Sequence, residues 1–530
     1  MTKQQLCLVL LASLGLSCVA APTGPGAAAL PSAVPVTEQA SHTTNGLQAS
    51  QHQNAQSYVS RYDLRAVFWG NLFYQLNCLA GQGFCSEAAF RALWEQELGW
   101  NQADAQQLAA FQVLRQQYSR QLQFAGPAEI QALPPRFEGI RTWDKVLQAA
   151  MNADSRQALA QNLALAMRPQ DAEALMGVLQ HFAPRFESWW LDGAEAVTRS
   201  AAEAFAAAMQ QQNLTELVQQ ASRFYRAELS DYSLLSFNFL ARPALERVNS
   251  VHGEQIENQS LVEVRENAPV QQQIPVVLHE LCHYLFKRSS RADEARRLQA
   301  FLAADNTAEG MAAYHLLDEV LATAIGNGLA GQRLLSATEF EALRQRPGAF
   351  YNDDWIDPLA KALYPRVAQA LQAGEAVHDE AFVKDYLRLA RDSLGSRLQS
   401  PVPLLRTLGG AYHPELATAF SDLQQQLRAG VTWAASGLDV NARSIFERHD
   451  ALSGVIMLRP ADLPLLSDWD PILGRSAREA IQAGTGSRVY GVQRNARAYL
   501  FVLVAATPAE ARTLSQRLLQ QPRWFSGPMP

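Results

Sequence analysis

The sequence predicts a predominantly helical α+β protein with a small β-sheet and more than one domain. Three observations support this prediction. With 530 residues and 48% hydrophobic side chains, the chain can form about two to four domains with sizeable cores. Apolar residues recur at three- and four-residue steps over much of its length, as amphipathic helices require. Alternation of apolar and polar residues, typical of half-buried strands, appears only after about residue 225.

The first 20 residues have the order of a secretory signal peptide, with Lys3 before an apolar stretch and small residues after it. The mature protein is therefore expected to be exported, either to the periplasm or to the medium. A second interpretation retains Cys18, because Leu16-Ser17-Cys18 loosely matches a bacterial lipoprotein cleavage site and would carry a lipid anchor. No other segment has the length and hydropathy expected of a transmembrane helix.

Composition separates the next two regions. Residues 21–56 are rich in small and polar residues and predict a flexible linker. Residues 57–225 show helical periodicity throughout and predict a helical N-terminal domain. Within it, Cys78 and Cys85 are expected to form a disulfide in an oxidising compartment, with two buried thiols as the alternative. The formal net charge of −6 provides no positive surface for a phosphate backbone, so nucleic acid is not an expected partner.

The second predicted domain covers residues 226–428 and begins with strands. Residues 234–240 and 260–266 alternate apolar and polar side chains. Residues 251–256 are expected to pair with the second of these strands. The domain therefore starts with a small sheet.

Helices are expected in the rest of this domain. One should cover residues 276–286, and a second should run from 307 to 325 and stop at Asn327-Gly328. More helices are expected over residues 337–428.

Residues 429–530 are expected to form a small C-terminal α/β module. Its predicted elements are a strand at 454–458, a helix near 476–483, a hairpin over 488–505 and a helix opened by Thr507-Pro-Ala-Glu510.

The first central helix carries the sequence His279-Glu280-Leu-Cys-His283. Side chains four residues apart on a helix lie one above the other, so both imidazoles can bind one metal ion. Glu280 lies at the rim of the same site, where a carboxylate can take a proton from a metal-bound water. The alternative is a pair of core histidines that are hydrogen-bonded to other neighbours. Uncharged residues on both sides indicate a buried helix, in which these polar groups need partners.

A catalytic zinc ion needs a third protein ligand. No other histidine follows His283 within the next ten residues, so a carboxylate is expected. Glu319 is the preferred ligand, because it lies among apolar residues in the middle of a helix, where a carboxylate needs a cation. Glu309, Asp318 and His315 are the alternatives.

Residues near Glu319 are candidates for supporting contacts. His315 and Thr323 lie one turn before and after it and can hydrogen-bond a ligand. Gly326 is small enough to let the two helices approach closely. Cys282 is expected to be a packed thiol rather than a ligand.

These motifs resemble those of the gluzincin class of zinc metallopeptidases, which includes thermolysin-like enzymes and the large zinc aminopeptidases. The resemblance rests on residues 276–285, with HExxH at their centre, and on Glu319-Val-Leu-Ala322, which looks like the downstream ligand helix. It implies a zincin-like core, a bound Zn²⁺ and a peptide or protein substrate. It also implies that Glu280 acts as general base on a zinc-activated water, and that strand 260–266 is the edge strand that holds an extended peptide. The aminopeptidase signature is absent, so no aminopeptidase activity is predicted.

Enzymes of this class usually contain a tyrosine or histidine that donates a hydrogen bond to the tetrahedral oxyanion. Tyr412 and His413, expected in a glycine-flanked loop, are the preferred candidates. Tyr351 is a further candidate. A turn that holds a packed tyrosine is the alternative interpretation of these positions.

The sequence therefore predicts an exported zinc metallopeptidase. A second hypothesis is a catalytically inactive, zincin-like envelope protein that binds peptides or partner proteins. A third is a helical envelope lipoprotein without a metal, in which the HExxH motif is accidental. The presence of Glu280 favours the first hypothesis over the second, because a purely structural zinc site does not need that carboxylate.

Overall fold

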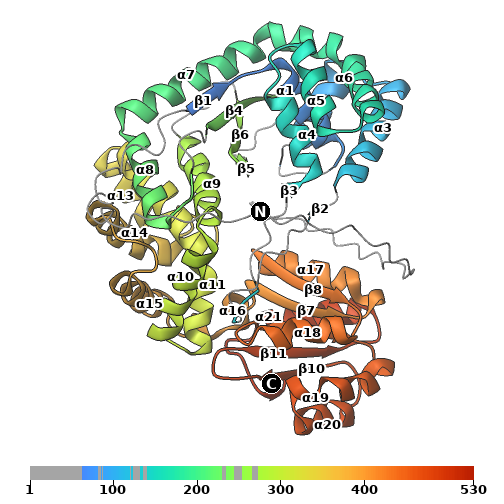
Figure 1. Cartoon of the computed structure of the whole chain (residues 1–530), viewed down its shortest axis with the longest axis vertical. Helices are drawn as coiled ribbons and strands as arrows, with labels where there is room; N and C mark the ends of the chain where they lie inside the picture. Colours follow the sequence, from blue (N-terminus) through green and yellow to red (C-terminus); the bar gives the residue numbers. More distant parts are fainter. Residues whose placement is uncertain are drawn as a thin grey trace, which may run out of the picture.

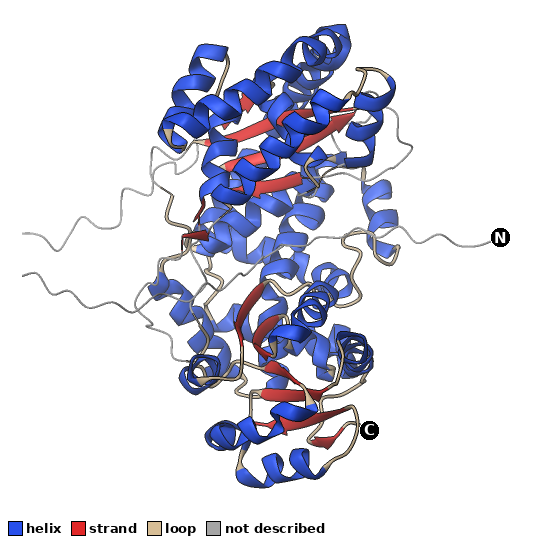
Figure 2. Ribbon diagram, turned by 90° about the vertical axis from the view of Figure 1, so that its right-hand side faces the viewer, coloured by secondary structure: helices blue, strands red, loops and turns tan. Residues whose placement is uncertain are grey.

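The structure is a computed structural model in which the predicted α+β class is confirmed. Helices predominate, and the strands form two mixed sheets of four and six strands and a separate pair, β2 (Gln121–Leu122) with β3 (Ile140–Arg141) (Figure 2). None of the described helices combines the length and hydropathy that a membrane crossing requires. The predicted signal peptide, Cys18 and the linker lie outside the described residues. The described ranges are 62–81, 85, 87–119, 121–122, 132–134, 140–229, 234–243, 253–265 and 272–530.

The N-terminal region begins with one short strand, β1 (Tyr62–Arg65), and is otherwise helical apart from the pair β2 and β3. The apolar faces predicted from periodicity are buried, as in the longest of these helices, where Leu175, Leu179, Phe182 and Phe186 point into the core. The predicted disulfide between Cys78 and Cys85 is present. The helices are α1 (Phe68–Leu79), α2 (Glu87–Gln96), α3 (Gln102–Tyr118), α4 (Thr142–Met151), α5 (Arg156–Ala166), α6 (Pro169–Trp189), the π-helix η1 (Trp190–Ala194), α7 (Glu195–Gln211) and α8 (Leu214–Tyr225).

The four-stranded sheet has the order β1-β4-β6-β5, with β4 (Leu235–Arg242), β5 (Gly253–Ile256) and β6 (Gln259–Arg265). β5 pairs with β6, as predicted, and this pair is antiparallel, whereas the other pairs are parallel. Helices cover both faces: α1 packs on one and α7 and α9 (Ile274–Lys287) on the other (Figure 1). Residues 62–65 therefore belong to this sheet, although the sequence predicted only helices there.

A side chain continues the pairing where β1 ends. The amide nitrogen of Asn71 in α1 donates to the carbonyl of Phe239 at 3.1 Å, and its oxygen accepts from the amide of Ala241 at 2.7 Å. These are backbone groups of β4 beyond its last pair with β1. Asn71 thus satisfies buried backbone groups that would otherwise lack partners.

The second central helix, α11 (Ala308–Ala322), does not stop where the sequence predicted. It continues through a π-helix, η3 (Thr323–Ala330), into α12 (Gly331–Leu334). Gly326 and Gly328 are positions of close packing rather than a helix end: a Cβ on Gly328 would lie 2.9 Å from Cβ of Tyr364. The remaining helices of this region are α10 (Arg291–Ala304), α13 (Ala337–Gln345), α14 (Ile356–Ala373), α15 (Glu380–Leu394), η4 (Gly395–Gln399) and α16 (Pro401–Leu404).

The six-stranded sheet has the order β12-β10-β11-β9-β7-β8 and forms, with its helices, the C-terminal module (residues 406–530). The predicted strand, hairpin and two helices are present as β9 (Gly454–Leu458), β10 (Arg488–Gln493) with β11 (Tyr499–Val504), α20 (Arg475–Ala483) and α21 (Pro508–Leu519). The other elements are β8 (Val431–Ser436), β12 (Gly527–Pro528), η5 (Pro414–Leu416), α17 (Ala417–Leu427), α18 (Val440–Arg448), η6 (Pro460–Trp469) and α19 (Asp470–Leu473).

The expected glycine-flanked loop near residue 410 is instead a buried strand, β7 (Thr407–Tyr412), which pairs with β8 and β9. Its glycines make room for aromatic rings. A Cβ on Gly409 would lie 2.5 Å from the ring of Phe446, and one on Gly410 would lie 2.2 Å from the ring of Phe420. Helices alone were expected up to residue 428, so this part of the prediction was wrong.

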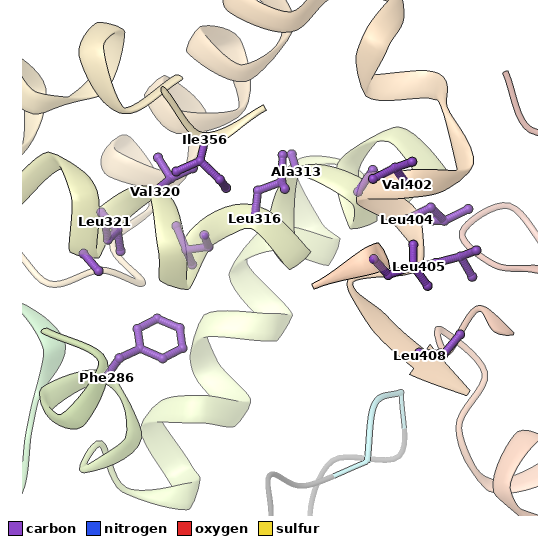
Figure 3. Packing of buried hydrophobic residues seen from close by; sticks show 14 of the residues in the cluster. Phe286, Ala313, Leu316, Val320, Leu321, Ile356, Val402, Leu404, Leu405 and Leu408 are labelled. Atoms are coloured by element: carbon purple, nitrogen blue, oxygen red, sulfur yellow. The ribbon is translucent and has the colours of Figure 1, made fainter. Parts of the chain in front are cut away.

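One hydrophobic cluster joins the helices around the HExxH motif to the C-terminal module. Figure 3 shows Val320 of α11 beside Ile356 of α14, and Ala313 of the same helix toward Leu404 of α16. Leu408 of β7 belongs to the same cluster. α16 therefore connects the module to the helix that carries Glu319, and the amide of Ala308 in that helix donates to the carbonyl of Ala496 in the module at 2.8 Å.

Candidate metal centre

Two helices that touch along their backbones bring the predicted ligands together. His279 and His283 lie on α9, and Glu319 lies on α11. In η3, directly after α11, a Cβ on Gly326 would lie 2.5 Å from the backbone nitrogen of His279 and 2.7 Å from the carbonyl oxygen of Pro275. Only a glycine permits this approach, so the predicted reason for a small residue at position 326 is confirmed.

The three predicted ligands converge on one point. The Nε2 atoms of His279 and His283 are 3.1 Å apart, and each is 3.6 Å from Oε2 of Glu319. Two ligands of a tetrahedral zinc ion at about 2.0–2.1 Å lie about 3.3 Å from each other. Oε2 of Glu319 is buried and has no hydrogen-bond partner among the described residues. The separation of the atoms and this unpartnered oxygen fit a shared divalent cation.

Oxygen atoms behind the imidazoles set their orientation. Nδ1 of His283 lies 3.0 Å from Oδ1 of Asp318, and Nδ1 of His279 lies 3.5 Å from Oγ1 of Thr323. A carboxylate only accepts, so Nδ1 of His283 carries the proton and its Nε2 can offer a lone pair to a metal. Thr323 therefore lies against His279, one of the predicted ligands. Asp318, which the sequence offered as an alternative ligand, contacts a histidine instead.

The charges at the site oppose the effect of burial. Burial alone would lower the pKa of His283, but Glu319 and Asp318 outweigh it and hold this pKa well above its ordinary value. Burial alone would raise the pKa of Glu319, but His283 and His279 hold this pKa well below its ordinary value. Glu319 is therefore ionised, which is the form that binds a cation.

Glu280 lies beside the ligands, next to the outermost strand of the sheet. A Cβ on Gly253 of β5 would lie 3.8 Å from Cγ of Glu280. Burial raises the pKa of Glu280, an effect that His279 and His283 partly oppose. A raised pKa suits a group that takes and returns a proton near neutral pH.

The edge strand next to the site is β5, not the strand predicted from residues 260–266. That strand, β6, pairs on one side with β4 and on the other with β5. Its acidic residue, Glu263, is buried and accepts a hydrogen bond from the hydroxyl of Tyr74 at 2.9 Å. The alternating pattern marks a strand, but it does not reveal how many neighbours the strand has.

Tyr351 is the aromatic residue that contacts the ligands. Its ring stacks on the imidazole of His279, with the centroids 5.3 Å apart and an angle of 13° between the planes. Burial, together with the charges of Glu319 and Glu280, raises the pKa of Tyr351 far above its ordinary value. The hydroxyl thus keeps its proton and can act as a hydrogen-bond donor.

Tyr412 and His413, the preferred candidates of the sequence prediction, lie in the C-terminal module. The ring of Tyr412 in β7 stacks on Phe420 at 4.7 Å, and Nδ1 of His413 accepts from the amide of Glu415 at 3.2 Å. The backbone amide of His413 donates to the carbonyl of Met457 at 2.8 Å. These contacts belong to the second sheet rather than to the ligand cluster.

The remaining candidates are not part of the cluster formed by His279, His283 and Glu319. Glu309 is in the first turn of α11, and one of its oxygens lies 3.5 Å from Nε2 of Gln399. The ring of His315 contacts Tyr314, with the centroids 6.0 Å apart. The thiol of Cys282 is buried, as expected for a packed cysteine.

Comparison with known proteins identifies no relative: no family model, no curated protein and no solved structure matches the chain. The residues of the site are therefore the only basis for assigning a function.

Proposed function

We propose that this protein is an exported, zinc-dependent metallopeptidase with a zincin-like core built on β4 to β6, α9 and α11. The observation that carries the proposal is the convergence of His279, His283 and Glu319, with ligand atoms 3.1 to 3.6 Å apart. Two features favour catalysis over a purely structural metal site: Glu280 lies beside the ligands, and β5 lies at the end of the sheet order.

Each group has a role in peptide hydrolysis. Zinc, held by His279, His283 and Glu319, would supply a Lewis acid for the scissile carbonyl and lower the pKa of the attacking water. Glu280 takes a proton from that water and returns it to the amine that leaves. Tyr351 donates its hydroxyl proton in a hydrogen bond to the oxyanion as it forms. The outer side of β5 pairs with an extended peptide or protein substrate, in the manner of an added strand.

The disulfide supports the proposed location. Disulfides persist in oxidising compartments such as the periplasm and the extracellular medium. The bond between Cys78 and Cys85 therefore agrees with export of the chain. The lipid anchor at Cys18 remains a prediction, because this residue lies outside the described part of the chain.

Glu280→Gln tests the catalytic role with little change of shape. The purified native protein should contain about one zinc ion per chain, measured by elemental analysis, and should hydrolyse a mixed peptide library. Glu280→Gln should retain the zinc, and its rate of hydrolysis should be lower than that of the native protein by a factor of about 10²–10⁴. Equal rates for the two proteins would eliminate catalysis and leave an inactive peptide-binding protein. A native protein without zinc would eliminate the metal centre itself.

A further inference from the structure

The loop that carries Tyr351 is held on one side by its own region of the chain. Asp357 in the first turn of α14 accepts from the amide of Gly348 at 3.0 Å and from that of Phe350 at 2.9 Å. Asp357 is in turn paired with Lys361 at 2.7 Å. These contacts fix the start of the loop.

The C-terminal module holds the other side of the same loop. Arg406, directly before β7, contacts Oδ2 of Asp353 at 2.5 Å through Nη2. Arg428, directly after α17, lies 3.6 Å from the same oxygen and donates to the carbonyl of Asn352 at 3.1 Å. The amide of Asp353 donates to the carbonyl of Tyr351 at 2.8 Å. The module thus contacts the loop one and two residues after Tyr351.

The ion pair between Arg406 and Asp353 is buried. The side chains of Asp353 and Arg406 are only 5% and 7% exposed. Oδ1 of Asp353 also accepts from the amides of Trp355 and Ile356, at 3.0 and 3.1 Å. Removing one partner of a buried pair leaves the other charge uncompensated, so any other position of this loop is strongly disfavoured.

We infer that the C-terminal module positions Tyr351 over the metal centre. We call Asp353, Arg406 and Arg428 the loop clamp. The clamp holds the loop just after Tyr351, whereas Asp357 accepts from the amides of Phe350 and Tyr351. The loop in turn keeps the tyrosine ring stacked on His279. The residues of the clamp are positioning residues, because they act through Tyr351. This gives the module a role in the activity, and the catalytic part of the inference rests on the proposed function.

Two variants test the clamp by kinetics. Asp353→Asn keeps an acceptor for the amides of Trp355 and Ile356 but removes the charge between the two arginines. Arg428→Gln retains the buried pair and changes a side chain that is 27% exposed, so it tests the same link with less risk to folding. Each should lower kcat for peptide hydrolysis by about tenfold to a hundredfold at unchanged KM and zinc content, because a displacement of about 1 Å costs that much.

Arg512→Gln is the matched control, since Arg512 pairs with Asp422 inside the module at 2.5 Å and both side chains are partly exposed. It should leave kcat unchanged. A loss of kcat in this control as large as in the clamp variants would overturn the inference.

A double-mutant cycle with Tyr351→Phe separates positioning from general damage. If the clamp acts through Tyr351, Asp353→Asn and Arg428→Gln should change kcat less than twofold in the Tyr351→Phe background. If the fold-loss of kcat in each double variant equals the product of the losses in its two single variants, the inference is overturned. Unchanged kcat in both clamp variants would also overturn it.

Hydrogen exchange of the zinc-free proteins gives a measurement that does not depend on activity. Amides of residues 350–355 should exchange at least tenfold faster in Asp353→Asn and Arg428→Gln than in the native protein or in Arg512→Gln. Unchanged exchange would refute the clamp even in an active enzyme. If the clamp variants exchange faster but the native protein and Glu280→Gln hydrolyse peptides at equal rates, the clamp is supported and the proposed peptidase function is rejected.

Discussion

Gly326→Ala should damage the candidate metal centre without replacing any of the three predicted ligands. The new Cβ would lie 2.5 Å from the backbone nitrogen and 2.7 Å from Cα of His279, and 2.7 Å from the carbonyl oxygen of Pro275. Ordinary contacts begin near 3.4 Å, so η3 and α9 must separate by about 1 Å. All three neighbours are backbone or Cα atoms, which cannot turn away as a side chain can.

Two measurable losses should follow from this separation. Overpacking of this kind costs about 1–3 kcal/mol of unfolding free energy. Distances from a metal ion to its ligands must hold to about 0.2 Å. A shift of about 1 Å between α9, which carries the histidines, and α11, which carries Glu319 and continues into η3, should therefore weaken zinc binding at least tenfold. Urea unfolding of the zinc-free protein measures the first loss, and competition with a chromophoric chelator measures the second.

Gly177→Ala is the matched control, because Gly177 lies inside α6 and nothing stands within 4 Å of its added Cβ. This change should raise stability by about 0.5–1 kcal/mol through helix propensity and leave zinc affinity unchanged. Native zinc affinity and native stability in Gly326→Ala would refute the close approach of the helices and the packing argument built on it.

Three further predictions concern other parts of the chain. Asp318→Asn should weaken zinc binding by about tenfold to a hundredfold, because it replaces the charged acceptor behind an imidazole; native affinity in the chelator assay would contradict this. Replacing Cys78 and Cys85 together by alanine should cost about 2–3 kcal/mol in urea unfolding, as expected for opening a short loop, whereas equal midpoints would argue against the bond. Burial opposes the ionisation of Asp104, but Arg185 and other partners lower its pKa below the ordinary 3.8. The contribution of this carboxylate to stability is therefore present above about pH 4 and disappears as the pH falls through the folded-state pKa. Asp104→Asn should therefore be less stable than the native protein at pH 7, and the difference should shrink at pH 3; a difference that does not depend on pH would exclude this linkage.

The sequence could predict that His279, His283 and Glu319 lie together, because the signals for the three residues are local. Two histidines at a four-residue spacing share a helix face whatever surrounds the helix. Glu319 stood out because an ionised side chain within an apolar stretch needs a cation nearby. Both arguments use only neighbours in the chain, and the structure brings these residues together.

Features that depend on distant segments could not be predicted in the same way. The stacking of Tyr351 on His279 depends on how distant segments pack, and no local pattern distinguishes Tyr351 from Tyr412. The glycines of β7 led to the prediction of a loop, because glycine is common in turns. In the structure they make room for aromatic rings from other elements. A glycine does not show whether it provides a turn or a close contact.

The place of β1 in the sheet limits how the proposed peptidase could be kept inactive. Many peptidases are made as zymogens whose leading segment is cut away. Here β1 pairs with β4, and Asn71 of α1 completes the hydrogen bonds of the same strand. A maturation cut after α8 that released residues 62–225 would strip β4 of these partners and expose Phe237 and Phe239, which now pack on Phe205. Release of residues 62–225 is therefore not expected to be the step that activates the proposed peptidase.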